Sequence, residues 1–369
     1  MSRNLLTSLS VCLALAAAPA QACPFCTGVE PTLTQRREAA AVVALAELIE
    51  SNAAGRTYRL HKVTQGADRL HGQETLLLPA ETALKAGGLA LLLGEESDDA
   101  ALSWTAEPLT ETAVAYVFRA PSLRQAAEER LRYFAPFLEH ADPAIAEDAY
   151  REFGHAPYDQ VAQTVDALPQ DRMCDWLVDV NVPQQRKGFY GLALGLAQDP
   201  AQRQAHAQFL RGLIETPADD FRAGFDGILG GYLVAAGVPA LELIEQKYLA
   251  NPQAADGDVR HAVTALRFYH EYGHGIPGLR LAQAMRHLLA RPEFAAAAIA
   301  DLSRWEDWDS LAAVVSLFGK EGYSARGIRQ AIAAYVLTCP TENAAASLAQ
   351  LREQAPLVVA DAERLLDRP

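Results

Sequence analysis

Between about residues 40 and 120, apolar residues occur in short runs, and in the rest of the chain they recur with the period of a helix. Gly, Asn and Asp separate the early apolar runs, as in Asn52–Gly55 and Gly87–Gly88, and these residues are typical of turns between strands. Five or six short strands in roughly 80 residues predict a small barrel or sandwich. The expected strands are Ala40–Leu48, Thr57–Val63, Glu74–Leu78, Leu89–Leu93, Leu102–Thr105 and Ala113–Phe118.

From Pro121 onward, apolar residues recur at i, i+3 and i+4, which indicates amphipathic helices. Many such helices joined by short turns with Pro, Asp or Gly predict a solenoid of helix pairs. Asp258–Leu266 is similar to the second-helix signature of HEAT-type repeats, and Asp142–Tyr150 is a looser relative of it. The expected helices are Leu123–His140, Ala144–Phe153, Gln184–Ala197, Ala201–Ile214, Leu241–Leu249, Val259–Glu271, Leu279–Leu289, Trp308–Phe318 and Gly327–Thr338.

The fold class expected from these patterns is α+β. Residues 1–22 are expected to be a signal peptide, residues 23–120 a small β domain, and residues 121–369 a helical-repeat (HEAT-like) domain. Half of the 369 residues are hydrophobic, which suffices for a packed core and excludes a disordered chain. Lys and Arg number 32 against 46 Asp and Glu, so the net charge is −14. This acidic balance argues against nucleic acid or an anionic membrane surface as a partner.

The first 22 residues have the organisation of an export signal. Arg3 supplies the positive charge, Leu5–Ala18 is an uncharged apolar run, and Ala20–Ala22 is a small-x-small cleavage site. Cleavage would make Cys23 the first residue, with soluble export favoured over a lipid anchor on that cysteine. We therefore expect an exported protein, periplasmic or extracellular. The most apolar later stretch, Phe225–Ile244, contains acidic residues, so we expect no transmembrane segment.

Four cysteines would remain after cleavage. Cys23 and Cys26 form a Cys-Pro-Phe-Cys tetrad, for which a local disulfide is favoured over thiol–disulfide catalysis, because no strand leads into the motif. Cys174 and Cys339 are separated by several repeats. In a solenoid each repeat contacts mainly its neighbours, so these two cysteines should remain unpaired.

His270-Glu271-Tyr272-Gly273-His274 matches the His-Glu-x-x-His pattern of zinc proteases. There, two histidines on one helix face bind zinc and the glutamate acts as general base. The glycines and Pro277 that follow instead predict a helix end, so we favour a helix terminus with a solvated histidine pair. A catalytic zinc site, with Glu293 as a third ligand, is the alternative.

The remaining candidates have structural interpretations. Trp305 and Trp308 are expected to pack into the helical array or to cap it. Asp219 and Asp220 are expected to cap a helix rather than to form a carboxylate dyad. The sequence contains no glycine-rich phosphate loop, Gly-x-Ser-x-Gly elbow or EF-hand spacing.

Several segments together carry a resemblance that covers nearly the whole chain: Cys23–Cys26, Thr32–Gln35, Asp148–Glu152, Gly188–Gly191, Ala265–Phe268, Asp301–Trp308 and Ala331–Pro340. With these segments the chain resembles an uncharacterised family of secreted proteins of planctomycete-type bacteria. The resemblance implies a small β domain followed by a helical array, and a strand rather than a helix at Ala40–Leu48. The β domain also resembles the OB-like barrel of netrin and of tissue metalloprotease inhibitors, although those begin Cys-x-Cys.

The favoured function is that of a non-enzymatic protein-interaction or scaffold protein, with a protein partner in the cell envelope. The first alternative is a zinc-dependent hydrolase that uses His270, Glu271 and His274. The second is a thiol–disulfide protein that uses Cys23 and Cys26.

Overall fold

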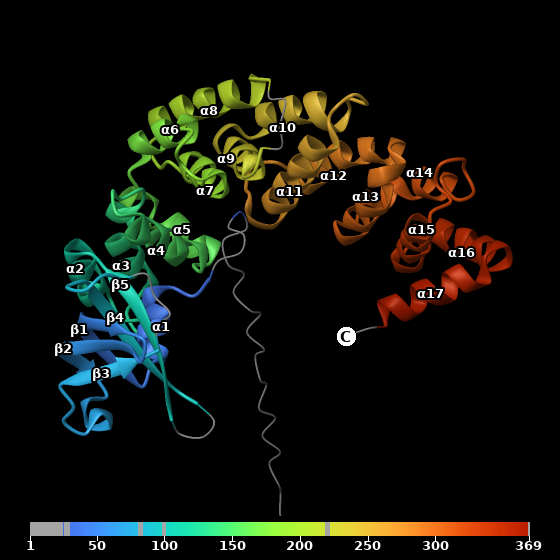
Figure 1. Ribbon diagram of the computed structural model, residues 1–369. Coiled ribbons are helices and arrows are strands. Elements are labelled where there is room, and N and C mark those ends of the chain that lie inside the picture. Colours follow the sequence, from blue (N-terminus) through green and yellow to red (C-terminus); the bar gives the residue numbers. More distant parts are fainter. Residues whose placement is uncertain (1–24, 26–29, 80–83, 98–100, 218–221, 368–369) are drawn as a thin grey trace, which may run out of the picture.

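The computed structural model describes residue 25 and residues 30–79, 84–97, 101–217 and 222–367 (Figure 1). The expected signal peptide, the two cysteines of the tetrad, and Asp219 and Asp220 lie outside the described residues. The chain is α+β. A curled antiparallel sheet near the N-terminus is followed by helices to the C-terminus.

Five strands form the sheet in the order β3-β2-β1-β4-β5, and all neighbours are antiparallel. Register shifts between β1 and β2 bend the sheet into a half-barrel. Five of the six predicted strands are thereby confirmed. The strands are β1 (Val42–Asn52), β2 (Gly55–Gln65), β3 (Thr75–Leu78), β4 (Leu89–Glu96) and β5 (Leu102–Leu109).

The apolar runs of β1 and β4 are explained by burial on both faces. Val42, Ala44 and Leu92 belong to a cluster of apolar residues that also includes Tyr58. Val43 and its neighbours Leu91 and Leu93 on β4 belong instead to the core that contains the helices. A strand covered on both faces loses the alternation of apolar and polar residues, which is why these runs are continuous.

The sixth predicted strand, Ala113–Phe118, is wrong, because this segment lies in helix α2 (Glu111–Arg119). The Thr110 hydroxyl accepts a hydrogen bond from the Ala113 amide at 3.1 Å and caps the helix. Ala113, Tyr116 and Val117 are buried on one side of α2, at i, i+3 and i+4. A short apolar run does not distinguish a strand from one buried helix face. The helices that follow the sheet thus begin at residue 111, whereas the sequence predicted them from residue 121.

The helices that follow agree with most of the predicted segments. The helix expected over Leu123–His140 spans only Ala127–Phe134. The helix expected over Leu241–Leu249 ends in a π-helical turn. The sequence missed α1, α5, α6, α9, α13, α16 and α17. The remaining helices are α1 (Leu33–Ala39), α3 (Ala127–Phe134), α4 (Pro143–Gly154), α5 (Tyr158–Gln163), α6 (Gln170–Val178), α7 (Gln184–Gly195), α8 (Pro200–Glu215), α9 (Phe225–Ala236), α10 (Val238–Ile244), α11 (Asp256–Tyr272), α12 (Gly278–Arg286), α13 (Pro292–Arg304), α14 (Leu311–Ser316), α15 (Arg326–Thr338), α16 (Glu342–Gln354) and α17 (Pro356–Leu366).

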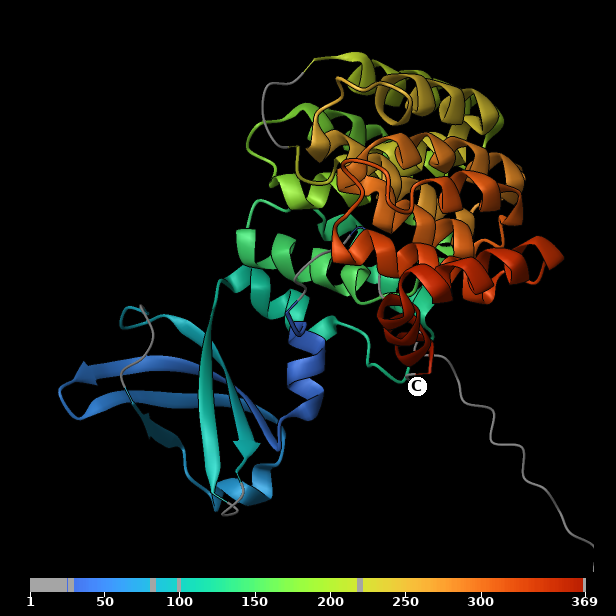
Figure 2. The same cartoon turned by 90° about the vertical axis from the view of Figure 1, so that its right-hand side faces the viewer.

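The helices from α6 onward form an arch. Helices α7, α9, α11, α13, α15 and α17 follow its inner side, whereas α8, α10, α14 and α16 lie on the outer side (Figure 1). Viewed at right angles, the sheet projects to one side of the helices (Figure 2).

Glycines bring the backbones of α7 and α9 into direct contact. A Cβ atom added at Gly191 would lie 2.7 Å from the Cα atom of Ile228, and one added at Gly231 would lie 2.6 Å from the carbonyl carbon of Gly191. Real side-chain carbons do not approach backbone atoms this closely, so only glycine is compatible with this spacing.

Cys174, on α6, and Cys339, which follows α15, are both free thiols, so the prediction that they do not pair is confirmed. No helix in the described ranges combines the length and the apolar composition that a bilayer span requires.

Candidate functional site

The His-Glu-x-x-His segment straddles a helix end. Helix α11 ends at Tyr272, and Gly273 has extended dihedral angles while its amide donates to the Tyr269 carbonyl. His270 therefore lies in the last turn of α11, and His274 lies beyond the helix. The Tyr269 hydroxyl donates a hydrogen bond to the His274 carbonyl and holds the chain after the turn. The two imidazoles are thus not one turn apart on a helix, as a zinc protease requires.

His270 and His274 are both exposed, as expected for a solvated pair, and His270 also packs against a tryptophan. Its ring stacks on Trp305 with centroids 4.5 Å apart and an angle of 11° between the planes. Burial lowers the pKa of the His270 imidazole. Trp308 packs edge-on against Tyr335 at 5.4 Å, so both tryptophans contribute to packing between helices.

Glu293, the third zinc ligand of the alternative interpretation, lies at the end of α13 opposite to the tryptophan that stacks on His270. Glu293 lies in the first turn of α13, where it pairs with Arg291 at 2.8 Å. Trp305, which stacks on His270, follows the last residue of α13, about 18 Å away at a rise of 1.5 Å per residue. Among the described residues, no three His, Cys, Asp or Glu side chains are placed to hold a metal ion together.

Phe25, inside the tetrad, is buried among aromatic residues of the helical array. Its side chain is 3% exposed, and its ring lies 4.8 Å from that of Phe268 on α11. A Cβ atom added at Gly230 would lie 2.7 Å from the Phe25 ring, so this glycine of α9 makes room for it. Tyr158 of α5 packs on Phe268 at 5.3 Å and on Tyr272 at 4.8 Å. Phe25 is therefore anchored on the helices, a contact that the sequence did not predict.

Asp148, on α4, forms a buried polar junction between the sheet region and the helices. Its carboxylate accepts hydrogen bonds from the Leu33 amide at 2.6 Å and from the Tyr116 hydroxyl at 2.7 Å. Burial, opposed by these two hydrogen bonds, raises the pKa of Asp148 to about 6. Burial, with the nearby Asp148 charge, also raises the pKa of Tyr116 above its usual range. The junction thus joins α1, α2 and α4.

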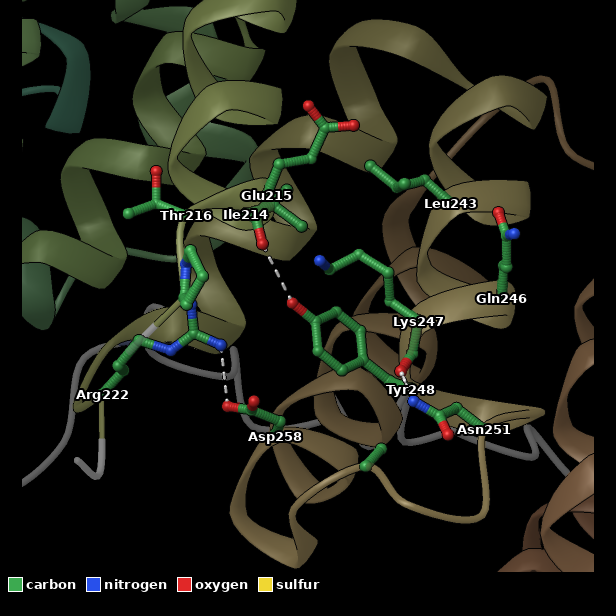
Figure 3. A pocket seen from close by; sticks show the side chains of 12 residues that line it. Ile214, Glu215, Thr216, Arg222, Leu243, Gln246, Lys247, Tyr248, Asn251 and Asp258 are labelled. Atoms are coloured by element: carbon green, nitrogen blue, oxygen red, sulfur yellow. Dashed lines mark hydrogen bonds and ion pairs between the residues drawn. The ribbon is translucent and has the colours of Figure 1, made fainter. Parts of the chain in front are cut away.

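A cavity of about 530 Å³ lies between the end of α8, the π-helical turn after α10 and the start of α11 (Figure 3). Arg222 pairs with Asp258 across it at 2.9 Å, and its guanidinium lies 3.4 Å from the centre of the Phe225 ring. The Tyr248 hydroxyl donates to the Ile214 carbonyl at 3.2 Å, and burial raises the pKa of Tyr248.

The polar groups of this cavity connect neighbouring helices. The Arg222–Asp258 pair attaches the residues before α9 to α11, and the Tyr248 hydrogen bond attaches the π-helical turn to the end of α8. Their partners are other side chains and backbone groups of the same cavity, so their arrangement supports a structural role. Lys247 and Gln246 also line the cavity.

Comparisons with known proteins give little further information. No family model matches the chain, and no curated protein matches its sequence. Among solved structures, human deoxyhypusine hydroxylase in complex with glycerol is similar at 14% identity and a TM-score of 0.28. This match covers 70% of this chain and 95% of that one.

Proposed function

We propose that this protein is exported and acts in the cell envelope as a non-enzymatic interaction or scaffold protein. We further propose that its helices form a HEAT-like solenoid and that its sheet is related to OB- and netrin-like barrels. The observation that carries the proposal is the recurrence of one kind of contact along the inner helices.

Arginine–aspartate pairs connect successive inner helices, or the residues just before one of them, at a nearly constant separation in sequence. Arg222 pairs with Asp258, Arg267 with Asp301 and Arg326 with Asp361, at separations of 36, 34 and 35 residues. Outside the inner helices, tyrosine hydroxyls donate to carbonyls at a similar separation, from Tyr248 to Ile214 and from Tyr323 to Leu289, both 34 residues apart. A contact that recurs about every 35 residues supports an array of repeats, each stacked on its neighbour.

Arrays of this kind usually bind other proteins, because stacking gives them a long concave face without a single enclosed cleft. The histidines that suggested zinc chemistry serve other contacts in this chain: His270 stacks on Trp305, and the His274 carbonyl accepts a hydrogen bond from Tyr269. These contacts favour an interaction protein over a hydrolase.

The export proposal rests on residues 1–22 and on the cysteine tetrad that follows them. A soluble form in the periplasm or outside the cell is favoured, and a lipid anchor on Cys23 is the alternative. Mass spectrometry of the mature N-terminus distinguishes the two forms, because an acylated Cys23 adds the mass of its lipid.

Affinity capture from envelope extract tests the interaction function. The tagged mature chain is expected to retain a defined partner, identified by mass spectrometry, that a heat-denatured sample of the same chain does not retain. Reciprocal capture with the tagged partner should recover this chain. Failure to retain any partner, together with turnover of a substrate by the purified protein, would overturn the proposal.

A further inference from the structure

A groove of about 220 Å³ separates two neighbouring helices of the inner side, α11 and α13. Unlike α7 and α9, whose glycines allow backbone contact, α11 and α13 are held apart by large side chains. Leu288, in the turn before α13, also lines the groove. The other lining residues are Arg260, Val263, Thr264 and Arg267 of α11, and Phe294, Ala297 and Ala298 of α13.

Three side-chain pairs join the two helices. The Arg260 guanidinium lies 5.3 Å from the centre of the Phe294 ring, and His270 stacks on Trp305. Between them, Arg267 forms an ion pair with Asp301 at 2.8 Å. The aromatic and arginine side chains are long, so they keep the helices apart over the length of the groove.

Both charged residues that line the groove are arginines. Arg267 is 43% exposed, and its partner Asp301 is fully buried and also binds Arg304. Arg260 is exposed, and among the described residues it forms no ion pair with a carboxylate. Among the other acids near these two helices, Glu271 is exposed, and Asp256 and Glu293 are paired with Arg291.

The floor between the arginines is apolar. Val263, Leu288, Phe294 and Ala298 are buried, while Ala297 is exposed. The cavity is smaller than the roughly 300–1,000 Å³ typical of small-molecule sites, so it suits one apolar side chain. Arg260 and Arg267 are seven residues apart on α11, which corresponds to about 10.5 Å and to roughly three residues of an extended peptide.

We propose that this groove binds an acidic segment of a partner protein. One apolar side chain of the segment inserts between α11 and α13, and carboxylates on either side of it pair with Arg260 and Arg267. Arginine clusters recognise acidic motifs in this way, through charge-assisted hydrogen bonds. The inference rests on the proposed interaction function and names the chemistry of the partner.

A fluorescein-labelled peptide of about ten residues, with Leu-Phe at its centre flanked by Glu and Asp, tests this site by fluorescence anisotropy with the mature chain. We expect Ala297→Phe, which fills the groove, to weaken binding about tenfold or more. Arg260→Gln should weaken it several-fold, and added salt should weaken it further. The matched controls are Ala300→Phe, an exposed position of α13 outside the groove, and Arg211→Gln on α8, and both should bind the peptide like the parent.

Binding of an uncharged Gln/Asn version of the peptide as tightly as the acidic one would overturn the inference, and so would unchanged binding by Ala297→Phe. Failure of the acidic peptide to bind the parent chain would also overturn it. Circular dichroism of each variant establishes that it is folded. The two proposals fail differently in the affinity capture. A partner retained equally by the parent and Ala297→Phe refutes the groove alone, whereas no partner on the parent chain, together with turnover of a substrate, refutes the interaction function.

Discussion

Alanine at Gly231 should destabilise the protein, although helix propensity alone predicts the opposite. In an unconstrained helix, replacing glycine by alanine gains about 1 kcal/mol. Gly231 is buried in α9, and an added methyl group would meet the carbonyl of Gly191 and lie 3.1 Å from the Cα atom of Leu192. These atoms belong to the backbone of α7 and cannot rotate away.

The size of the effect follows from the separation that the methyl group requires. Its carbon would lie 2.6 Å from the Gly191 carbonyl carbon, whereas carbon atoms pack at about 3.5–4.0 Å, so the two helices must separate by roughly 1 Å. A gap of that size forfeits a quarter to a half of the dispersion energy of the other contacts between α7 and α9. Overpacking typically costs about 1–3 kcal/mol, and a rigid backbone clash belongs at the upper end. After the gain in propensity, the net loss is about 2 kcal/mol.

Gly212→Ala is the matched control. Gly212 lies inside α8, and a Cβ atom added there meets no atom within 4 Å. This variant should be about 1 kcal/mol more stable than the parent. Thermal unfolding followed by circular dichroism at 222 nm should therefore give a Tm above the parent for Gly212→Ala and below it for Gly231→Ala. If both substitutions raise the Tm, the close backbone contact between α7 and α9 is refuted.

Three further predictions concern titration, thiols and metal. The pKa of Asp148 is about 6 when folded and about 3.9 when unfolded, so the folded state binds the proton more tightly. The stability from this group is thus complete below about pH 4 and is lost as the pH rises through 6, about 3 kcal/mol in all. Tm measured against pH should show this loss in the parent and not in Asp148→Asn, and identical profiles would contradict it. Thiol titration of the denatured, unreduced mature protein should find two thiols, Cys174 and Cys339, because Cys23 and Cys26 are expected to be bonded; four thiols would refute that disulfide. The zinc content of the purified protein should be substoichiometric and unchanged by His270→Ala. One zinc per chain that is lost in His270→Ala would instead support the zinc-dependent hydrolase.

The positions of most strands and helices could be predicted from the sequence alone, because they depend on neighbouring residues. Turn residues separate the apolar runs that became β1 to β5, and the helical period identifies α4, α7, α8, α11 and α15. The end of α11 could also be predicted, since the glycines and the proline that close it lie within a few residues of Tyr272. For the same reason, the sequence correctly predicted a helix end within the His-Glu-x-x-His segment.

Only the tertiary structure decided which distant residues meet. The apolar run Ala113–Phe118 is compatible with a strand or with a helix. In the structure it is a helix, and the Tyr116 hydroxyl on that helix donates a hydrogen bond to the distant Asp148. Nothing local to Phe25 indicates that it packs on Phe268, or that Gly230 makes room for it. The groove between α11 and α13 exists because arginine and aromatic side chains, rather than glycines, meet there. Periodicity records which face of a helix is apolar, whereas the spacing between two helices depends on the shapes of both surfaces, which a sequence pattern does not contain.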